Sequence, residues 1–170
     1  MRFDATRVWH GTMPVEFLYT PGVAGLRFFQ TLKQKGVLAV TFCAECTVTY
    51  LPPRVYCENC FADLSDAWQE VPGRGRVHTF TLVRVDRQGR RLQTPEIVAF
   101  VRIDGTDGGL VTRLVDVAPA DVRLDLPVEI VLQPPRRRRA VPTDIVGFTP
   151  LRSAPLRSTP TRTARRGRKR

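Results

Sequence analysis

Hydrophobic positions near the start of the chain predict a single helix. Between residues 22 and 35 the large apolar residues recur at a spacing of three: Val23, Leu26, Phe29 and Leu32. This spacing places them along one face of a helix. Pro21 suits the first turn, and Gly36 suits the left-handed conformation that ends many helices. The sequence therefore predicts a helix over Gly22–Lys35.

Strand-like runs dominate the rest of the chain. Two short β-branched runs, residues 37–42 and 48–51, lie on either side of the first pair of cysteines, and two prolines at residues 52–53 then interrupt any β-ladder. After Trp68, five apolar or alternating runs predict strands over residues 77–85, 97–103, 110–115, 128–132 and 145–149. Five short strands predict a small closed barrel, with an oligonucleotide/oligosaccharide-binding (OB) barrel as the leading interpretation. Periodicity alone does not separate it from another small barrel.

The four cysteines form two Cys-x-x-Cys pairs with ten residues between them: Cys43, Cys46, Cys57 and Cys60. Each pair can form one tight turn that presents two thiolates to the same ion, as in zinc ribbons. A four-thiolate shell leaves no open position for water, so we expect a structural Zn²⁺. Iron in a rubredoxin-like electron carrier also suits four thiolates, and the spacing does not exclude it.

Composition limits the other functions that the chain can have. No run of 18 apolar residues is present, and the first residues contain no apolar core of an export signal, so we expect a cytoplasmic protein that does not span a membrane and has no disulfides. The histidines, His10 and His78, have no adjacent acid and nucleophile. We therefore expect no catalytic residue in this chain.

The net charge of +11 is concentrated at the end of the chain. Residues 1–135 contain 15 basic and 15 acidic residues, whereas residues 136–170 contain 12 basic residues and one acid. We expect four consecutive arginines, residues 136–139, to form an exposed connection. Residues 151–170 have too few large apolar side chains to order, which predicts a disordered Arg-rich tail that binds nucleic acid only weakly.

Several stretches resemble, in order, the family called domain of unknown function 35. They are the two cysteine pairs in FCAECTVTYLPPRVYCENC, Pro-Pro-Arg at residues 52–54, Gly-Arg-Gly at 73–75, Thr-Phe-Thr at 79–81 and Phe-x-Pro at 148–150. The resemblance covers roughly residues 15–150. The second cysteine pair lacks the glycine often found nearby, and the Arg-rich tail is not part of the family pattern.

This resemblance implies a mainly β protein with an N-terminal helix, in which a rubredoxin-like zinc ribbon precedes a five-stranded OB-fold barrel. We expect an N-terminal helical segment (1–36), the ribbon (37–68), the OB-fold domain (69–150) and the tail (151–170). Family members are usually non-catalytic partners of thiolase-fold enzymes, including thiolases, hydroxymethylglutaryl-CoA synthases and aldolases. They form hetero-oligomers with these enzymes and help shape the acyl-CoA channel.

Three arginines are candidates for contacts with the phosphates of a shared acyl-CoA: Arg54, Arg74 and Arg76. Guanidinium groups bind phosphate as planar forks, and Gly73 and Gly75 would let the backbone approach a ligand closely. A solvated turn is the simpler interpretation of the same residues. The alternative function is a nucleic-acid-binding protein, in which Tyr50, Phe80 and Phe100 would stack on bases.

Overall fold

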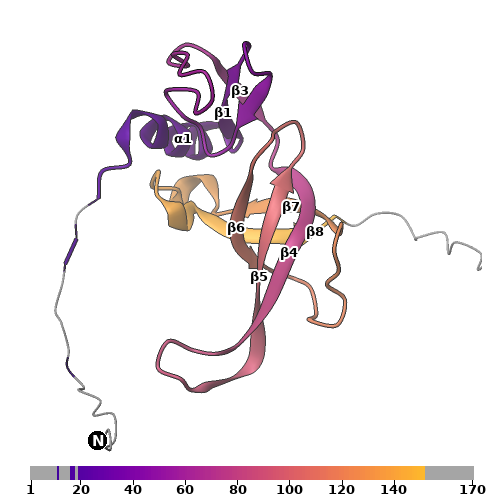
Figure 1. The fold of residues 1–170 in the computed structure, drawn as a ribbon. Coiled ribbons are helices and arrows are strands. Elements are labelled where there is room, and N and C mark those ends of the chain that lie inside the picture. The colour runs from indigo at the N-terminus through magenta and orange to yellow at the C-terminus, as the bar shows by residue number, and fades with distance from the viewer. Residues whose placement is uncertain (1–10, 12–15, 18, 152–170) are drawn as a thin grey trace, which may run out of the picture.

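The computed structural model of the 170-residue chain describes residues 11, 16–17 and 19–151. This part comprises one α-helix, a three-stranded sheet and a closed five-stranded barrel, and the helix and the small sheet lie together at one end of the barrel (Figure 1). The predicted fold class is confirmed: the protein is mainly β, with an N-terminal helix and an OB-type barrel. The predicted tail lies outside the described residues, apart from Leu151.

The helix α1 (Gly22–Lys35) has the predicted bounds. Gly36 adopts a left-handed conformation with φ 72°, and its N–H donates to the Leu32 carbonyl at 3.0 Å. Glycine adopts this conformation without the clash that a Cβ would cause, which is why the helix ends here.

The buried face of α1 differs from the predicted stripe. Phe28 and Leu32 are buried, whereas Val23 is 74% and Leu26 is 49% exposed. The core therefore covers only the second half of the predicted apolar stripe. The physical reason is the position of the helix, which packs on β1 (Leu38–Cys43) and on the short helix η2 (Pro142–Asp144) through its C-terminal half.

The small sheet consists of β2 (Val48–Tyr50), β1 and β3 (Trp68–Val71), in that order and antiparallel. The strand β3 was not predicted, because four residues are too few to show an alternation. The boundary proposed between residues 68 and 69 falls inside this strand. The division of the chain into four segments stays a prediction.

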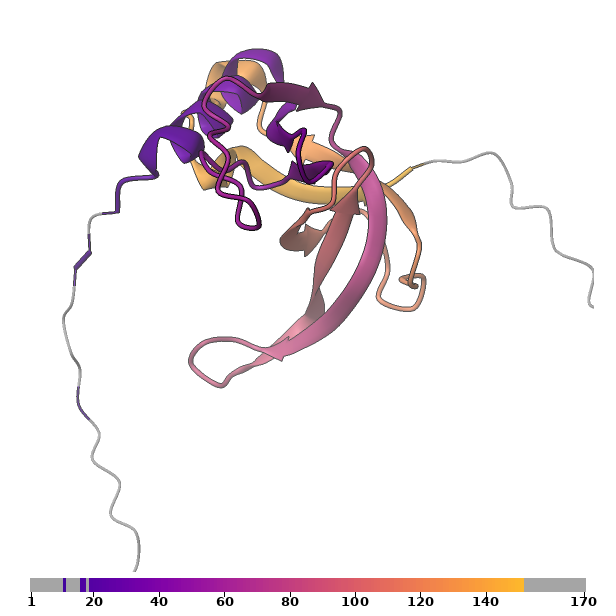
Figure 2. The same cartoon turned by 45° about the horizontal axis from the view of Figure 1, so that its top comes forward.

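The barrel contains all five predicted strands: β4 (Arg74–Val85), β5 (Arg91–Ile103), β6 (Gly109–Leu114), β7 (Pro127–Leu132) and β8 (Ile145–Pro150). Their order is β4-β5-β6-β8-β7, and β7 pairs with β4 to close the barrel. All pairs are antiparallel except β6 with β8. The strands β4 and β5 are longer than predicted and continue as a hairpin beyond the barrel (Figure 2).

One hydrophobic core joins the helix, the small sheet and the barrel. Its fully buried members come from all three parts: Leu32, Leu38, Val40, Val77, Val101, Val128 and Phe148. A second, smaller cluster surrounds Cys43 and Cys57. Because most of the apolar core is shared, the helix and the small sheet are packed firmly on the barrel.

The connection between β7 and β8 contains the four arginines together with η1 (Pro135–Arg137) and η2. The expectation of exposure is wrong for Arg138, which is half-buried. Its Nε donates to the Gln133 carbonyl at 2.7 Å and its Nη1 to the Leu32 carbonyl at 3.4 Å, so it links this connection to the end of α1. Buried Asp144 accepts backbone N–H groups from Arg139 and Ala140.

Across the described residues, no helix has both the length and the apolar character that a membrane crossing requires.

Candidate metal centre

The structure brings the four predicted cysteines to one point. Cys43 ends β1 and Cys46 lies in the turn that follows, while the second pair lies in a loop closed by a bridge between Tyr56 and Asp63. All four Sγ atoms lie within 4.8 Å of one another. The Sγ atoms of Cys43 and Cys60 are 3.5 Å apart.

Two of the sulfur–sulfur distances are close to those of a single tetrahedral ion. Zinc–sulfur bonds of about 2.3 Å place the sulfur atoms of a tetrahedral site about 3.8 Å apart. The Sγ atoms of Cys46 and Cys57 are 3.8 Å apart. Four thiolates are the donor set of structural zinc sites, and they also suit iron. The cluster is therefore positioned to bind a metal ion with all four of its donors.

The two turns that carry the cysteine pairs share an unusual backbone conformation. Thr47 follows the first pair with φ 54°, and Phe61 follows the second pair with φ 59°. Such left-handed conformations are uncommon for residues other than glycine. The Phe61 N–H donates to the Cys57 carbonyl at 3.0 Å, which closes the second turn. A phenylalanine therefore takes up this strained conformation in the second turn, where a glycine would be unstrained.

Tyr50 is a part of the centre that sequence analysis did not assign to it. Its hydroxyl lies 3.2 Å from the Cys57 Sγ. The Cys60 backbone N–H and then this hydroxyl lower the pKa of Cys57 to about 6. The same hydrogen bond raises the pKa of Tyr50 to about 12. This lowering of the pKa favours the thiolate of Cys57, which is the form that binds metal. No sequence signal distinguished Tyr50 from other strand aromatics.

Burial differs among the four ligands. Cys43 and Cys57 are fully buried with Leu64 and Tyr50, whereas Cys60 is exposed. This cluster is small and contains few large apolar side chains, so a bound metal would supply much of its folding free energy. When all four sulfurs bind, no position remains for a water molecule, and the site has a structural role.

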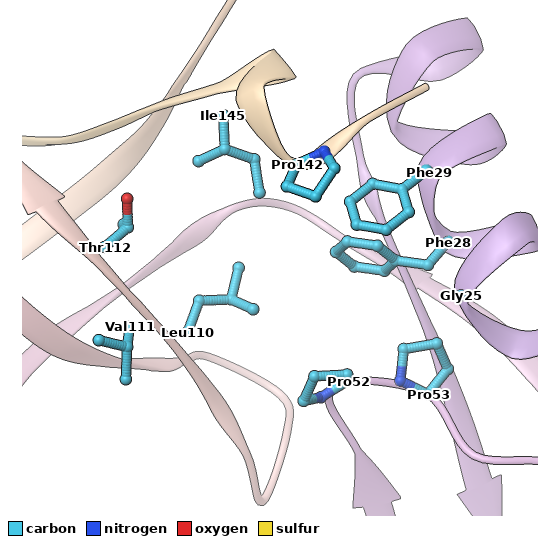
Figure 3. Close-up of a pocket in the computed structure, with 10 residues that line it drawn as sticks. All are labelled: Gly25, Phe28, Phe29, Pro52, Pro53, Leu110, Val111, Thr112, Pro142 and Ile145. Atoms are coloured by element: carbon cyan, nitrogen blue, oxygen red, sulfur yellow. The ribbon is translucent and has the colours of Figure 1, made fainter. Parts of the chain in front are cut away.

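An apolar pocket lies where the helix, the ribbon and the barrel meet (Figure 3). Its volume is about 280 Å³. Figure 3 shows side chains from separate segments facing the same space: Phe28, Phe29, Pro52, Pro53, Leu110 and Ile145. Sequence analysis missed it because the lining comes from distant segments. The two prolines indicated only the end of a strand.

Two of the three candidate arginines lie on one face of β4, and the third lies in the ribbon. Arg74 and Arg76 both extend outward from β4, where Arg74 lies 3.9 Å from Glu129 and Arg76 donates to the Asp125 carbonyl at 3.3 Å. Arg54 lies in the ribbon, pairs with Glu58 at 2.5 Å and covers the Tyr50 ring.

Gly73 and Gly75 are both buried inside the barrel wall. A Cβ at Gly73 would lie 2.1 Å from the Ile130 Cγ2, and one at Gly75 would lie 2.1 Å from the Arg102 carbonyl oxygen. The expectation that they allow a ligand to approach is therefore wrong. Their small size is needed for β4 to pack against its neighbouring strands.

The aromatic residues proposed to stack on bases do not form an exposed platform. Tyr50 is buried against Cys57, and half-buried Phe80 packs on the main core. Half-buried Phe100 lies edge-on to His78, with ring centres 5.8 Å apart. This arrangement offers nucleic-acid bases no continuous flat surface.

Comparison with known proteins gives consistent matches. The family described as "ChsH2, C-terminal OB-fold domain" matches residues 68–133. A relative from Methanocaldococcus jannaschii is 27% identical over 109 residues, which cover 64% of this chain and 76% of the relative. One from Methanothermobacter thermautotrophicus is 24% identical over 109 residues, which cover 64% of this chain and 80% of the relative. Both are named "DUF35 domain-containing scaffold protein", where DUF35 stands for domain of unknown function 35.

Two solved structures share the fold. A Sulfolobus solfataricus protein of unknown function from the DUF35 family superposes with a TM-score of 0.55 at 28% identity, over 65% of this chain and 78% of that one. The structure named "Ltp2-ChsH2(DUF35) aldolase" gives a TM-score of 0.52 at 24% identity, over 73% of this chain and 91% of that one. With the cysteine cluster and the closed barrel, these matches confirm that the chain belongs to the domain of unknown function 35 family, with a C-terminal OB-fold domain of the ChsH2 type.

Proposed function

We propose that this chain is a non-catalytic, zinc-binding accessory subunit that docks on a thiolase-fold enzyme and helps to form its acyl-CoA channel. The observation that carries this proposal is the match of the barrel to the ChsH2 family, because the aldolase structure with the same fold is named for ChsH2 together with Ltp2. The curated relatives are named as scaffold proteins, which agrees with an accessory role.

The chemistry of the metal centre supports a structural role. The cluster offers four sulfur donors, and Cys43 and Cys57 are fully buried. We assign the metal as Zn²⁺ because a closed four-thiolate shell is its usual structural site. Such a zinc has no open coordination position and holds the ribbon in shape without activating water. The thiolase-fold partner then supplies the nucleophile and the base.

The apolar pocket supports a contribution to the acyl channel. Its lining is almost wholly hydrocarbon, with Phe28 and Phe29 on one side and Leu110 and Ile145 on another (Figure 3). A volume of about 280 Å³ is large enough for part of an acyl chain. Binding an apolar chain here would remove its surface from water, which is favourable by about 25 cal/mol per Å².

Exposed apolar side chains near the start of α1 support docking on a partner. Tyr19 is 85%, Val23 74% and Leu26 49% exposed, and they belong to one continuous stretch of chain. A group of exposed apolar side chains is typical of surfaces that bind another protein. Covering these side chains would complete the apolar stripe that the helix sequence encodes.

The phosphates of acyl-CoA would contact Arg74 and Arg76 on β4, with Arg54 as a further candidate on the ribbon. Arg74 and Arg76 are exposed, and Arg74 is only weakly paired, since Glu129 lies 3.9 Å away. Arg54 would have to leave Glu58 to bind a phosphate. Guanidinium groups suit this role because they donate two parallel hydrogen bonds to phosphate oxygens.

The proposal is tested by co-expressing the chain with a candidate thiolase-fold enzyme, which we expect to be encoded in a neighbouring gene, and purifying through a tag on one subunit. We expect the two proteins to co-purify in a fixed ratio and to act on acyl-CoA only together. Turnover of acyl-CoA by this chain alone would contradict the proposal. The nucleic-acid alternative would be favoured by a different result. In that case the chain would bind single-stranded nucleic acid in a salt-sensitive way even after removal of residues 151–170, and it would not bind the enzyme.

A further inference from the structure

The hairpin of β4 and β5 projects from the barrel as a two-stranded arm, which we define as residues 82–96 (Figures 1 and 2). Pairing of β5 with β6 begins only at Ile97, and pairing of β4 with β7 covers only residues 74–76. Within the part of the chain that the structure describes, both outer edges of the arm therefore have no strand partner. A two-stranded hairpin outside a larger sheet has marginal stability in water, so contact with a partner would stabilise the arm.

The arm carries an excess of positive charge. Its four arginines are Arg84, Arg87, Arg90 and Arg91, against two acids, Asp86 and Glu96. Asp86 lies 2.7 Å from the Arg90 Nε and also accepts the Gln88 and Arg90 backbone N–H groups, which closes the turn at the tip. Among the described residues, the other three arginines form no ion pair. Three guanidinium groups are thus exposed and available to a partner.

The arm also has an apolar contact point between these charges. Val83 pairs with Glu96, but Val85 pairs with Arg91, so β5 contains extra residues and bulges away from β4. A hollow of about 400 Å³ forms at this bulge, and its lining consists of Arg84, Val85, Arg91, Leu92, Gln93 and Pro95. Val85 is 48% exposed. An aliphatic patch surrounded by arginines is typical of protein-binding surfaces, which enrich arginine and apolar side chains.

We propose that this arm docks on an acidic surface of the partner protein, with carboxylates facing Arg84, Arg87 and Arg91 and an apolar side chain entering the hollow beside Val85. The inference rests on the proposed function, in that the partner is the enzyme on which the chain docks. Charge complementarity argues for an acidic surface, because three free guanidinium groups would repel a basic one. The bulged apolar hollow favours a protein over nucleic acid.

The test compares two charge-reversed variants of the full chain in binding to the partner enzyme. The arm variant carries R84E, R87E and R91E, and the barrel control carries R113E, R123E and R136E, which are also exposed and outside the described ion pairs. We expect the arm variant to raise Kd at least about tenfold at low salt, with a smaller rise at high salt, and the control to change it little. Amide exchange on the arm should also slow in the wild-type complex.

The outcomes separate the inference from the proposed function. If the wild-type chain binds no thiolase-fold enzyme, both are overturned. If the wild type binds and the two variants weaken binding equally or not at all, only the arm inference is overturned. Loss of single-stranded DNA binding in the arm variant, with enzyme binding intact, would also overturn it. An unchanged melting temperature of the arm variant confirms that it folds.

Discussion

Asp107 and Thr49 exchange two hydrogen bonds across the junction of the barrel and the ribbon. The Thr49 N–H donates to the Asp107 carboxylate at 2.8 Å, and the Asp107 N–H donates to the Thr49 carbonyl at 3.0 Å. Gly108 lies beside this pair, where a Cβ would come 2.0 Å from the Leu51 carbonyl oxygen. The turn between β5 and β6 therefore fixes the ribbon that carries the cysteines directly on the barrel.

Replacing Asp107 by alanine should loosen this junction. The change removes one hydrogen bond from the Thr49 N–H, which corresponds to about 0.5–1.5 kcal/mol of stability and about 1–6 °C in Tm for a chain of this size. Urea unfolding of the metal-loaded protein measures the effect. Asp104→Ala is the control, since Asp104 is exposed in the same turn and its carboxylate has no described partner. Equal stability of the two variants would show that the junction does not depend on this contact.

Because Phe61 has a left-handed backbone conformation, we expect a glycine at this position to be more stable than an alanine, the reverse of the usual order. Phe61 is 78% exposed, so removing its ring exposes little new surface. We expect Phe61→Gly to be more stable than Phe61→Ala by about 1 kcal/mol, because only glycine is unstrained at φ 59°. Thermal unfolding of both variants checks this. Asp66 is exposed and has no positive φ, so there the alanine variant should be more stable than the glycine variant. The same order at both positions would rule out strain at Phe61.

Replacing Tyr50 by phenylalanine should weaken metal binding and shift its pH dependence. The Cys60 backbone N–H and then the Tyr50 hydroxyl lower the pKa of Cys57 to about 6, which favours its thiolate at neutral pH. Without the hydroxyl this pKa rises, and metal loading should require a more alkaline pH. We expect about tenfold lower affinity at neutral pH, measured by competition with a chelator. Tyr56→Phe, on an exposed ring, is the control. Identical loading curves for the three proteins would contradict this role of Tyr50.

Substitutions on β4 test the proposed contact with acyl-CoA. Arg74→Ala and Arg76→Ala should each raise the KM of the enzyme complex for acyl-CoA by about threefold to tenfold, since a guanidinium–phosphate contact is lost. Steady-state kinetics of the reconstituted complex measure this, with Arg123→Ala as an exposed control on the barrel. If KM is unchanged in both β4 variants, these arginines are only solvated turn residues.

The sequence predicted the elements that depend on local signals. The helix bounds followed from Pro21 and Gly36, and the metal cluster followed from the spacing of the cysteines, because a tight turn needs only neighbouring residues. The five barrel strands followed from apolar runs that alternate or continue over several residues.

Features that depend on distant contacts were not predictable in the same way. Val23 and Leu26 belong to the apolar stripe of the helix, yet the core covers only its other half. The role of Tyr50 depends on the loop that brings Cys57 to its hydroxyl. The pocket combines residues as distant as Phe28 and Ile145. Each of these depends on where elements lie in space, which periodicity along the chain does not determine.

Metal analysis of the purified enzyme complex tests the central claim most directly. We expect one zinc per copy of this chain in the wild-type complex, and loss of both the zinc and the partner enzyme when Cys57 is replaced by serine, because a ribbon with three ligands no longer folds. A Cys57→Ser chain that keeps its metal and its partner in the wild-type ratio would contradict the account.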